Sequence, residues 1–428
     1  MSGSLVADLG VGPEIWLFMT FLSCMTLFFK FSRFWSVRNL DLCLIFAMAP
    51  GMQLLVGHRS ASSLWAFVLL FLGSMLWLVR CFVDLGLSRR PLLEPNLNAP
   101  GLACLVIGVV GLFIAETVSL PVGEGAKRNP ADSSAGQRAD PPHFDSTVVD
   151  ETVETMIQIA PLPRSLVEKP RPVVLQRVLA CLAHLALVAG MILVGVRHFD
   201  RPIAGLAAAV CYLLLPYSRF ALVDTGQVVP AALIVMALVF YQRPALVGAL
   251  IGLAAGWMPA CLGLIPLWAG FYRKRGLLRF TSVGLGVVLL CGFLGMEWTS
   301  LATWARALGA RSLAEAGLVP NVVAPVTGSF WSGFEPSFRL PVLIAYLFLV
   351  IGTAYWPAEK NLGELISLSA AVLIASQFWY LDAGGTLIIL YLPLLVLMMF
   401  RPNLAARRPA LRHRRSLRTV QKTLFPGD

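Results

Sequence analysis

Long apolar runs recur along most of the chain, and they limit its possible folds more than any other feature. Several of them match the length of about 20 residues at which an α-helix crosses a hydrocarbon layer. Hydrophobic residues make up 57% of the 428 residues and charged residues only 13%, whereas soluble domains carry about 25% charged residues. Helices satisfy their own backbone hydrogen bonds in lipid. The sequence therefore predicts an all-α integral membrane protein, a polytopic helical bundle.

Charged residues divide the apolar runs and predict the helices and their direction. We expect about 11 spanning helices, near residues 14–30, 41–57, 63–83, 101–121, 173–196, 203–218, 228–241, 280–296, 340–356, 363–379 and 385–400. If the N-terminus lies outside, the basic clusters between these helices fall on the cytoplasmic side, together with the C-terminus. The expected location is the bacterial inner (cytoplasmic) membrane.

One apolar stretch, from Pro244 to Phe271, does not fit this count. Basic residues flank it at both ends, and the sequence Gly-Trp-Met-Pro at 256–259 interrupts it in the middle. Each half is too short to cross a bilayer. The pattern predicts a re-entrant hairpin that enters and leaves from the cytoplasmic side. The alternative interpretation is one long kinked helix.

The spacing of helices and loops also predicts three parts. Residues 1–98 form an N-terminal three-helix membrane unit, 99–400 the membrane core, and 401–428 a basic cytoplasmic tail. Two long outer loops, 122–172 and 297–337, each contain an amphipathic segment, DSTVVDETVETMIQIAP and EWTSLATWARALGARSLAEAG. We expect these segments to be interfacial helices on the outer side. The tail is expected to contact anionic membrane lipid and not nucleic acid.

Motifs of metal sites and soluble enzymes are missing from the sequence. The eight cysteines lie in or at the ends of apolar runs without a C-x-x-C pair, which is typical of small core residues. The five histidines are scattered, and the chain contains no P-loop, H-E-x-x-H or G-x-S-x-G. We therefore expect no cofactor, and the sequence indicates no metal site but leaves the need for a divalent metal open.

The stretch PYSRFALVDTGQVVPAALIV, residues 216–235, places Arg219, Asp224 and Gln227 between two apolar runs. Sugar transfer from a lipid phosphate needs a carboxylate to take the acceptor's proton and a cation to hold the phosphate. Arg219 could supply the cation, and Asp224 and Gln227 could hold sugar hydroxyls. The structural alternative is a solvated outer loop and a snorkelling Arg219 that pairs with Asp224. Carboxylates for the first role stand in the outer loop, at Asp145, Asp150, Glu151 and Glu154.

One long segment resembles the central helices of the GT-C superfamily of membrane glycosyltransferases. Its sequence is VLQRVLACLAHLALVAGMILVGVRHFDRPIAGLAAAVCYLLLPYSRFALVDTGQVVPAALIVMALVFY. The continuation RPALVGALIGLAAGWMPACLGLIPLWAGFYRKRG is similar to the paired short helices of its polyprenol-phosphate-mannose-dependent branch, with Gly226-Gln227 at the G-Q motif. The resemblance covers roughly residues 170 to 280, and the segment LYLPLLVLMMF weakly.

This resemblance implies transfer of a sugar from a polyprenyl-phosphate donor to an outward-facing acceptor, which is a glycan, a lipid or a protein. It places the catalytic carboxylate on the first outer loop, where Asp150 or Asp145 is the expected base and Glu151 a further candidate. The family commonly has an acidic residue soon after the first core helix, where this chain has Glu116. Arg219 is then the phosphate partner, and Asp224 and Gln227 position the donor.

Two other classes of function stay open at this point. A transporter or flippase is suggested by the broken hairpin and by polar residues near helix ends, although the helices hold few mid-membrane charges for ion coupling. The second is a non-catalytic membrane scaffold of the same fold, whose outer loop binds a partner.

Overall fold

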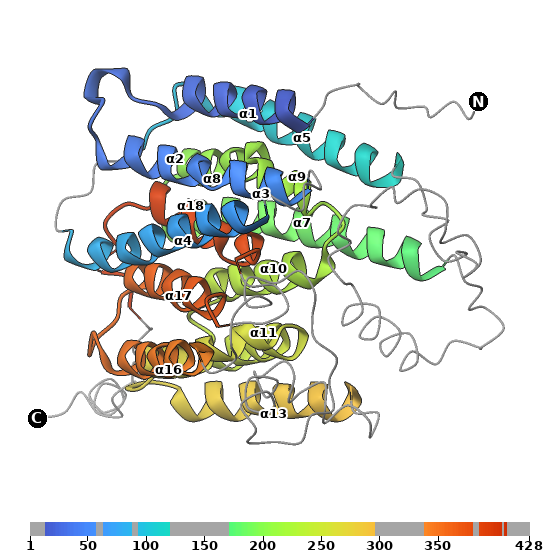
Figure 1. The fold of residues 1–428 in the computed structure, drawn as a ribbon. Helices are drawn as coiled ribbons and strands as arrows, with labels where there is room; N and C mark the ends of the chain where they lie inside the picture. The colour runs from blue at the N-terminus through green and yellow to red at the C-terminus, as the bar shows by residue number, and fades with distance from the viewer. Residues whose placement is uncertain are drawn as a thin grey trace, which may run out of the picture.

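The computed structural model describes residues 13–56, 63–87, 93–119, 171–295, 338–379, 385–404 and 406–408, and within these ranges it contains helices and no strand. Figure 1 shows the helices packed side by side along one common direction. The predicted all-α class is confirmed. The helices of the first half are α1 (Pro13–Phe28), η1 (Phe31–Arg33), α2 (Val37–Ala47), α3 (Ala49–Val56), α4 (Ser63–Gly86), α5 (Ala99–Ser119), α7 (Arg171–Arg197) and α8 (Pro202–Leu214).

The second half continues the bundle with shorter helices. They are α9 (Pro216–Phe220), α10 (Thr225–Val239), α11 (Pro244–Trp257), η5 (Pro259–Gly263), α12 (Leu264–Phe271), α13 (Leu277–Gly295), α16 (Arg339–Tyr355), α17 (Leu362–Ser376) and α18 (Ile388–Phe400). The predicted interfacial helices in 122–172 and 297–337 lie outside the described residues, as does the tail beyond residue 408.

Three helices in the described ranges are long and apolar enough to cross a membrane. They are Trp65–Gly86 in α4, Ala99–Val118 in α5 and Val174–Arg197 in α7. Shorter apolar stretches in the other described helices, such as Leu277–Phe293 in α13, have 10–17 residues. At a rise of about 1.5 Å per residue, the longest of these reach about 25 Å, so they are shorter than a full hydrocarbon layer.

Two predicted helices are interrupted. The run 41–57 forms two helices, α2 and α3, that meet at Met48, and α2 begins earlier than expected because the Ser36 side chain accepts a hydrogen bond from the Asn39 backbone and caps it. The run 203–218 breaks at Leu215, which is extended because a proline follows it. This second break sets Arg219 on its own short helix, α9.

The chain turns back on itself between α11 and α12. Gly276, which follows α12, lies against the side chain of Pro244, where α11 begins. The extended residue Met258 and the 3-10 helix η5 form the turn at the far end. The two halves therefore start and finish at the same end of the bundle, as the predicted hairpin requires and one continuous kinked helix does not allow.

Loop contacts define two ends of the bundle. At the basic end, on the left in Figure 1, lie the loop residues 29–36, 93–98, 198–201, 240–243, 272–276, 356–361, 401–404 and 406–408. There Asn96 donates its backbone N–H to Leu27, and Arg408 donates to Glu359 at 2.6 Å. The opposite end contains α9 and the turn at η5, since Trp257 donates to the Thr225 carbonyl there.

Apolar side chains fill the centre of the bundle and also cover parts of its outside. Every residue of α18 is buried, which is typical of a helix surrounded by other helices. On α13, by contrast, Leu278, Leu289 and Phe293 are 82%, 73% and 75% exposed, and Phe348 on α16 is 70% exposed. Large exposed apolar side chains on two helices suit contact with a membrane or a partner.

Candidate functional site

Arg219 and Glu116 form an ion pair at the opposite end of the bundle. The Arg219 Nε donates to Glu116 Oε1 at 2.8 Å, although 103 residues separate the two in the chain. Their side chains are 28% and 25% exposed, so the pair is open to a ligand. α5 supplies the carboxylate in its last turn, and the short helix α9 supplies the guanidinium.

The aromatic ring of Trp16 fixes the face of this guanidinium. The Arg219 Cζ lies 4.5 Å from the centre of the Trp16 ring on α1, within the range of a cation–π contact. Within the ranges that the structure describes, no acceptor bonds the two terminal nitrogens of Arg219. These two groups form the planar fork that binds a carboxylate or phosphate through two parallel hydrogen bonds.

Asp224 and Gln227 bond each other at the start of α10. Asp224 is the N-cap residue, and its Oδ1 accepts from the Gln227 backbone N–H at 3.3 Å while Oδ2 accepts from Gln227 Nε2 at 3.0 Å. Burial raises the pKa of Asp224, and the hydrogen bonds from Gln227 and Gly226 oppose that rise. The predicted pairing of Arg219 with Asp224 is therefore wrong, because Arg219 binds Glu116 and the cap occupies Asp224.

Two buried polar atoms beside this cap lack partners in the described part of the chain. They are Gln227 Oε1 and Thr225 Oγ1. Buried polar groups in folded proteins are nearly always hydrogen-bonded, and an exception calls for an explanation such as a ligand or a water molecule. Two side chains from other helices bind the neighbouring backbone. Gln176 Nε2 donates to the Val223 carbonyl at 3.5 Å, and Trp257 Nε1 donates to the Thr225 carbonyl at 3.1 Å.

The structure thus brings together Glu116 and Arg219 from the predicted set, and Asp224 with Gln227 as a second pair. Asp145, Asp150 and Glu151 lie outside the described residues. Among the described residues, no group of three or more His, Cys, Asp or Glu side chains is placed to hold a metal ion.

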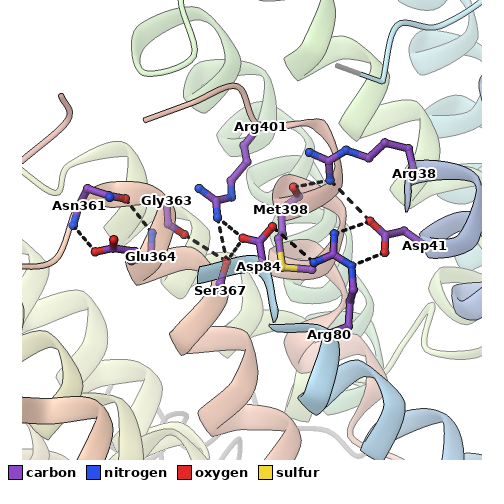
Figure 2. A network of polar contacts seen from close by, with 10 residues as sticks. All are labelled: Arg38, Asp41, Arg80, Asp84, Asn361, Gly363, Glu364, Ser367, Met398 and Arg401. Atoms are coloured by element: carbon purple, nitrogen blue, oxygen red, sulfur yellow. Dashed lines mark hydrogen bonds and ion pairs between the residues drawn. The ribbon is translucent and has the colours of Figure 1, made fainter. Parts of the chain in front are cut away.

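A second polar cluster, which the sequence analysis did not predict, lies buried at the basic end (Figure 2). Arg80 on α4 binds Asp41 on α2 through two bonds of 2.6 and 2.9 Å, and contacts Asp84 at 3.4 Å. Asp84 also accepts from Arg401, which follows α18, and from Ser367 on α17 at 2.7 Å. The side chains of Asp84 and Arg401 are 0% and 1% exposed.

The charge of this cluster is balanced with help from a helix end. Arg38 contacts Asp41 at 3.5 Å and donates to the Met398 carbonyl at 3.1 Å. That carbonyl belongs to the last turn of α18, where the helix dipole places partial negative charge. The three arginines of the cluster therefore meet two aspartates and the negative end of α18. Arg38 and Arg80 belong to basic clusters that were expected on the cytoplasmic side, and Arg401 was expected to begin the basic cytoplasmic tail.

Signals for this cluster were present locally but not over long range. Arg38 and Asp41 stand three residues apart, and Arg80 and Asp84 four, the spacings that bring side chains together on a helix. The contact with Arg401 depends on how α4, α17 and α18 pack, which no local pattern reveals.

Comparisons with protein-family models, with curated proteins and with solved structures find no match to this chain.

Proposed function

We propose that this protein is an integral membrane glycosyltransferase of GT-C type, which moves a sugar from a polyprenyl-phosphate donor to an outward-facing acceptor. The observation that carries the proposal is the contact between Glu116 and Arg219, which sets a carboxylate beside a guanidinium whose terminal nitrogens are open to a ligand. Sugar transfer from a lipid phosphate requires a base for the acceptor's proton and a fork that binds the phosphate.

The surface of the bundle supports a membrane location. The exposed leucines and phenylalanines of α13 and α16 suit lipid contact, and the basic clusters gather at one end, as the positive-inside rule requires of the cytoplasmic side. In this proposal the basic end faces the cytoplasm, and Arg219 and Glu116 face outward. The proposal keeps about 11 crossings and a re-entrant hairpin formed by α11 and α12, in a bacterial inner membrane.

The chemistry assigns a step to each member of the pair. The acceptor hydroxyl attacks the anomeric carbon of the donor sugar, so a bond forms from the acceptor oxygen to that carbon and the bond from carbon to phosphate oxygen breaks. Glu116 takes the proton of the acceptor hydroxyl, and polyprenyl phosphate leaves with the electron pair. Its phosphate gains negative charge in this step, which the Arg219 fork stabilises. In this proposal Gln227 holds a sugar hydroxyl through Oε1, and Asp224 positions the Gln227 side chain by accepting from its Nε2.

The resting geometry suits both roles at once. Arg219 uses its Nε–H to orient Oε1 of Glu116 and leaves Oε2 for the acceptor. The Trp16 ring covers one face of the guanidinium and limits its rotation. Positioned groups of this kind supply much of the rate enhancement in transfer reactions.

A transfer assay with purified protein in vesicles tests the proposal. With polyprenyl-phosphate mannose as the donor, the readout is release of polyprenyl phosphate in the presence of a membrane extract that supplies acceptors. Glu116→Gln should lower kcat about 10²-fold or more, and Arg219→Lys should raise KM because an ammonium lacks the planar fork. Glu94→Gln and Arg201→Lys, at the basic end, are matched controls and should leave the rate unchanged.

Parallel variants decide which carboxylate is the base. If Glu116→Gln keeps the wild-type rate while Asp150→Asn, Asp145→Asn or Glu151→Gln abolishes transfer, the base lies on the first outer loop and Glu116 only orients Arg219. If no polyprenyl-phosphate sugar binds the wild-type protein, the transferase proposal is wrong.

A further inference from the structure

A cavity lined by basic residues lies at the basic end of the bundle, opposite the end that contains Glu116 and Arg219. Its volume is about 140 Å³, which is room for a phosphate group, since one water molecule takes about 30 Å³ in the liquid. The cavity opens between the end of α12 and the loop that joins α16 to α17. Five cationic side chains and one carboxylate line it: Arg273, Lys274, Arg275, Lys360, Arg408 and Glu359.

The single lining carboxylate does not cancel the positive charge. Glu359 accepts from Lys274 and from Arg408, the latter at 2.6 Å, and these two cations lower its pKa. Arg273 lies with its guanidinium 5.7 Å from the ring centre of Tyr355. Within the described part of the chain, no carboxylate pairs with Arg273. Among the described residues, Arg273 therefore lines the cavity as a cation without a carboxylate partner.

Lys360 is a fixed cation at the wall of this cavity. Lys360 is 3% exposed, and its Nζ donates to the carbonyls of Ala354 and Pro357 at 3.0 and 2.9 Å. These bonds cap the end of α16 and use two of the three donors of an ammonium group. Burial lowers the pKa of Lys360 to about 8; Glu364 raises it and Arg273 lowers it. The side chain thus stays mostly charged at neutral pH.

Aromatic side chains next to the cavity indicate its depth in a membrane. Tyr355 and Trp356 are 65% and 60% exposed at the end of α16. Tyrosine and tryptophan concentrate at the level of lipid headgroups, where an apolar ring and a polar edge are both satisfied. Lysine and arginine clusters at the cytoplasmic surface attract anionic lipids at the same level.

We propose that this cavity binds a phosphate group, from the headgroup of an anionic phospholipid or from a soluble phosphate compound. Arg273 supplies the guanidinium fork, Lys274 and Arg408 rotate from Glu359 to share the anion, and Lys360 adds fixed positive charge. The site is independent of the sugar-transfer proposal, because it uses other residues at the other end of the bundle.

Titrations of the melting temperature in neutral detergent test this site. The probes are phosphatidylglycerol, phosphatidylcholine, and sodium phosphate against sodium chloride of the same ionic strength. Arg273→Gln should raise the midpoint concentration of the binding anion about tenfold, the loss expected for one charge-assisted hydrogen bond. Glu359→Gln should lower the midpoint, because it removes the competing carboxylate. Arg279→Gln removes the same charge from an exposed residue nearby on α13 and is the matched control.

The outcomes separate the two sources and include refutation. Stabilisation by phosphatidylglycerol alone identifies a lipid headgroup, and stabilisation by sodium phosphate as well identifies a soluble phosphate. If Arg273→Gln and Arg279→Gln shift the midpoint equally, the effect is one of overall charge and the site does not exist. The proposal also fails if neither anion raises the melting temperature of the wild-type protein above its matched neutral control.

Discussion

Replacing Asp84 by asparagine should destabilise the bundle more than any substitution in its surface ion pairs. The side chain of Asp84 is 0% exposed and accepts hydrogen bonds from Arg401, Arg80 and Ser367. Asparagine has nearly the same shape but no charge. The variant would leave Arg401, with its side chain 1% exposed, buried without its carboxylate. The cluster would then hold three arginines and a single carboxylate, Asp41, which contacts Arg38 and Arg80.

The size of this effect follows from the burial of the pair. Removing one partner of a buried ion pair costs about 3–5 kcal/mol, because the remaining charge keeps its desolvation penalty without the compensating attraction. The asparagine carbonyl can still accept one hydrogen bond, so we expect the lower part of this range. Arg201 and Glu94, by contrast, lie 4.0 Å apart with side chains 49% and 67% exposed. Pairs of that kind contribute about 0–1 kcal/mol.

Reversible unfolding in mixed detergent micelles, followed by tryptophan fluorescence, measures both variants under one set of conditions. Asp84→Asn should lower the free energy of unfolding by at least about 2 kcal/mol more than Glu94→Gln. The double variant Asp84→Leu with Arg401→Met should be more stable than Asp84→Leu alone, because it removes both buried charges. Equal effects of Asp84→Asn and Glu94→Gln would show that the cluster is hydrated and refute this account.

Three further predictions concern other parts of the bundle. Gly252→Ala should lower the melting temperature because its Cβ would lie 2.5 Å from a backbone oxygen of α13, whereas Gly286→Ala, with nothing within 4 Å, should not. Asn361→Ala breaks the capping box at the start of α17 and should cost about 1 kcal/mol in the same unfolding assay. Because Lys360 has a folded pKa of about 8, below its ordinary 10.5, the unfolded chain binds more protons between these values. Wild-type stability relative to Lys360→Met should therefore rise as pH increases from about 8 toward 10.5, and a flat difference would contradict the lowered pKa.

Sequence patterns predicted where helices lie much better than which side chains meet. The apolar run before residue 86 and the run before 197 are long and uninterrupted, so α4 and α7 end within a few residues of their expected positions. The break at Met48 was missed because residues 42–52 are apolar without a charge, although the Pro-Gly pair that follows at 50–51 is a local signal of interruption. Pro216 gave a similar signal before Arg219.

Charged side chains were harder to place because their partners come from distant helices. The positive-inside rule placed Arg38, Arg80 and the tail from Arg401 on the cytoplasmic side, but that rule concerns orientation and not contact. In the folded chain they converge on Asp41 and Asp84 because α2, α4 and the end of α18 meet at the basic end (Figure 2). The pairing of Arg219 with Glu116 likewise needs the packing of α9 near α5, which carries no periodic signal.

The surroundings of Arg219 distinguish it from other arginines placed at the opposite end of the bundle. Arg177 donates to the Val118 carbonyl at 3.3 Å, near the end of α5, and Arg339 donates to the Trp379 carbonyl at 2.7 Å, just after α17. The Val118 carbonyl is one that a helix end leaves open, and the Trp379 carbonyl belongs to the turn after α17, so a structural role accounts for both bonds. Arg219 instead contacts a carboxylate and an aromatic ring and remains 28% exposed. Arg219 lies at the end opposite the basic clusters, so the positive-inside rule for membrane orientation does not account for it. Under the proposed function, the Arg219 guanidinium, held by Glu116 and Trp16, binds the phosphate of the donor.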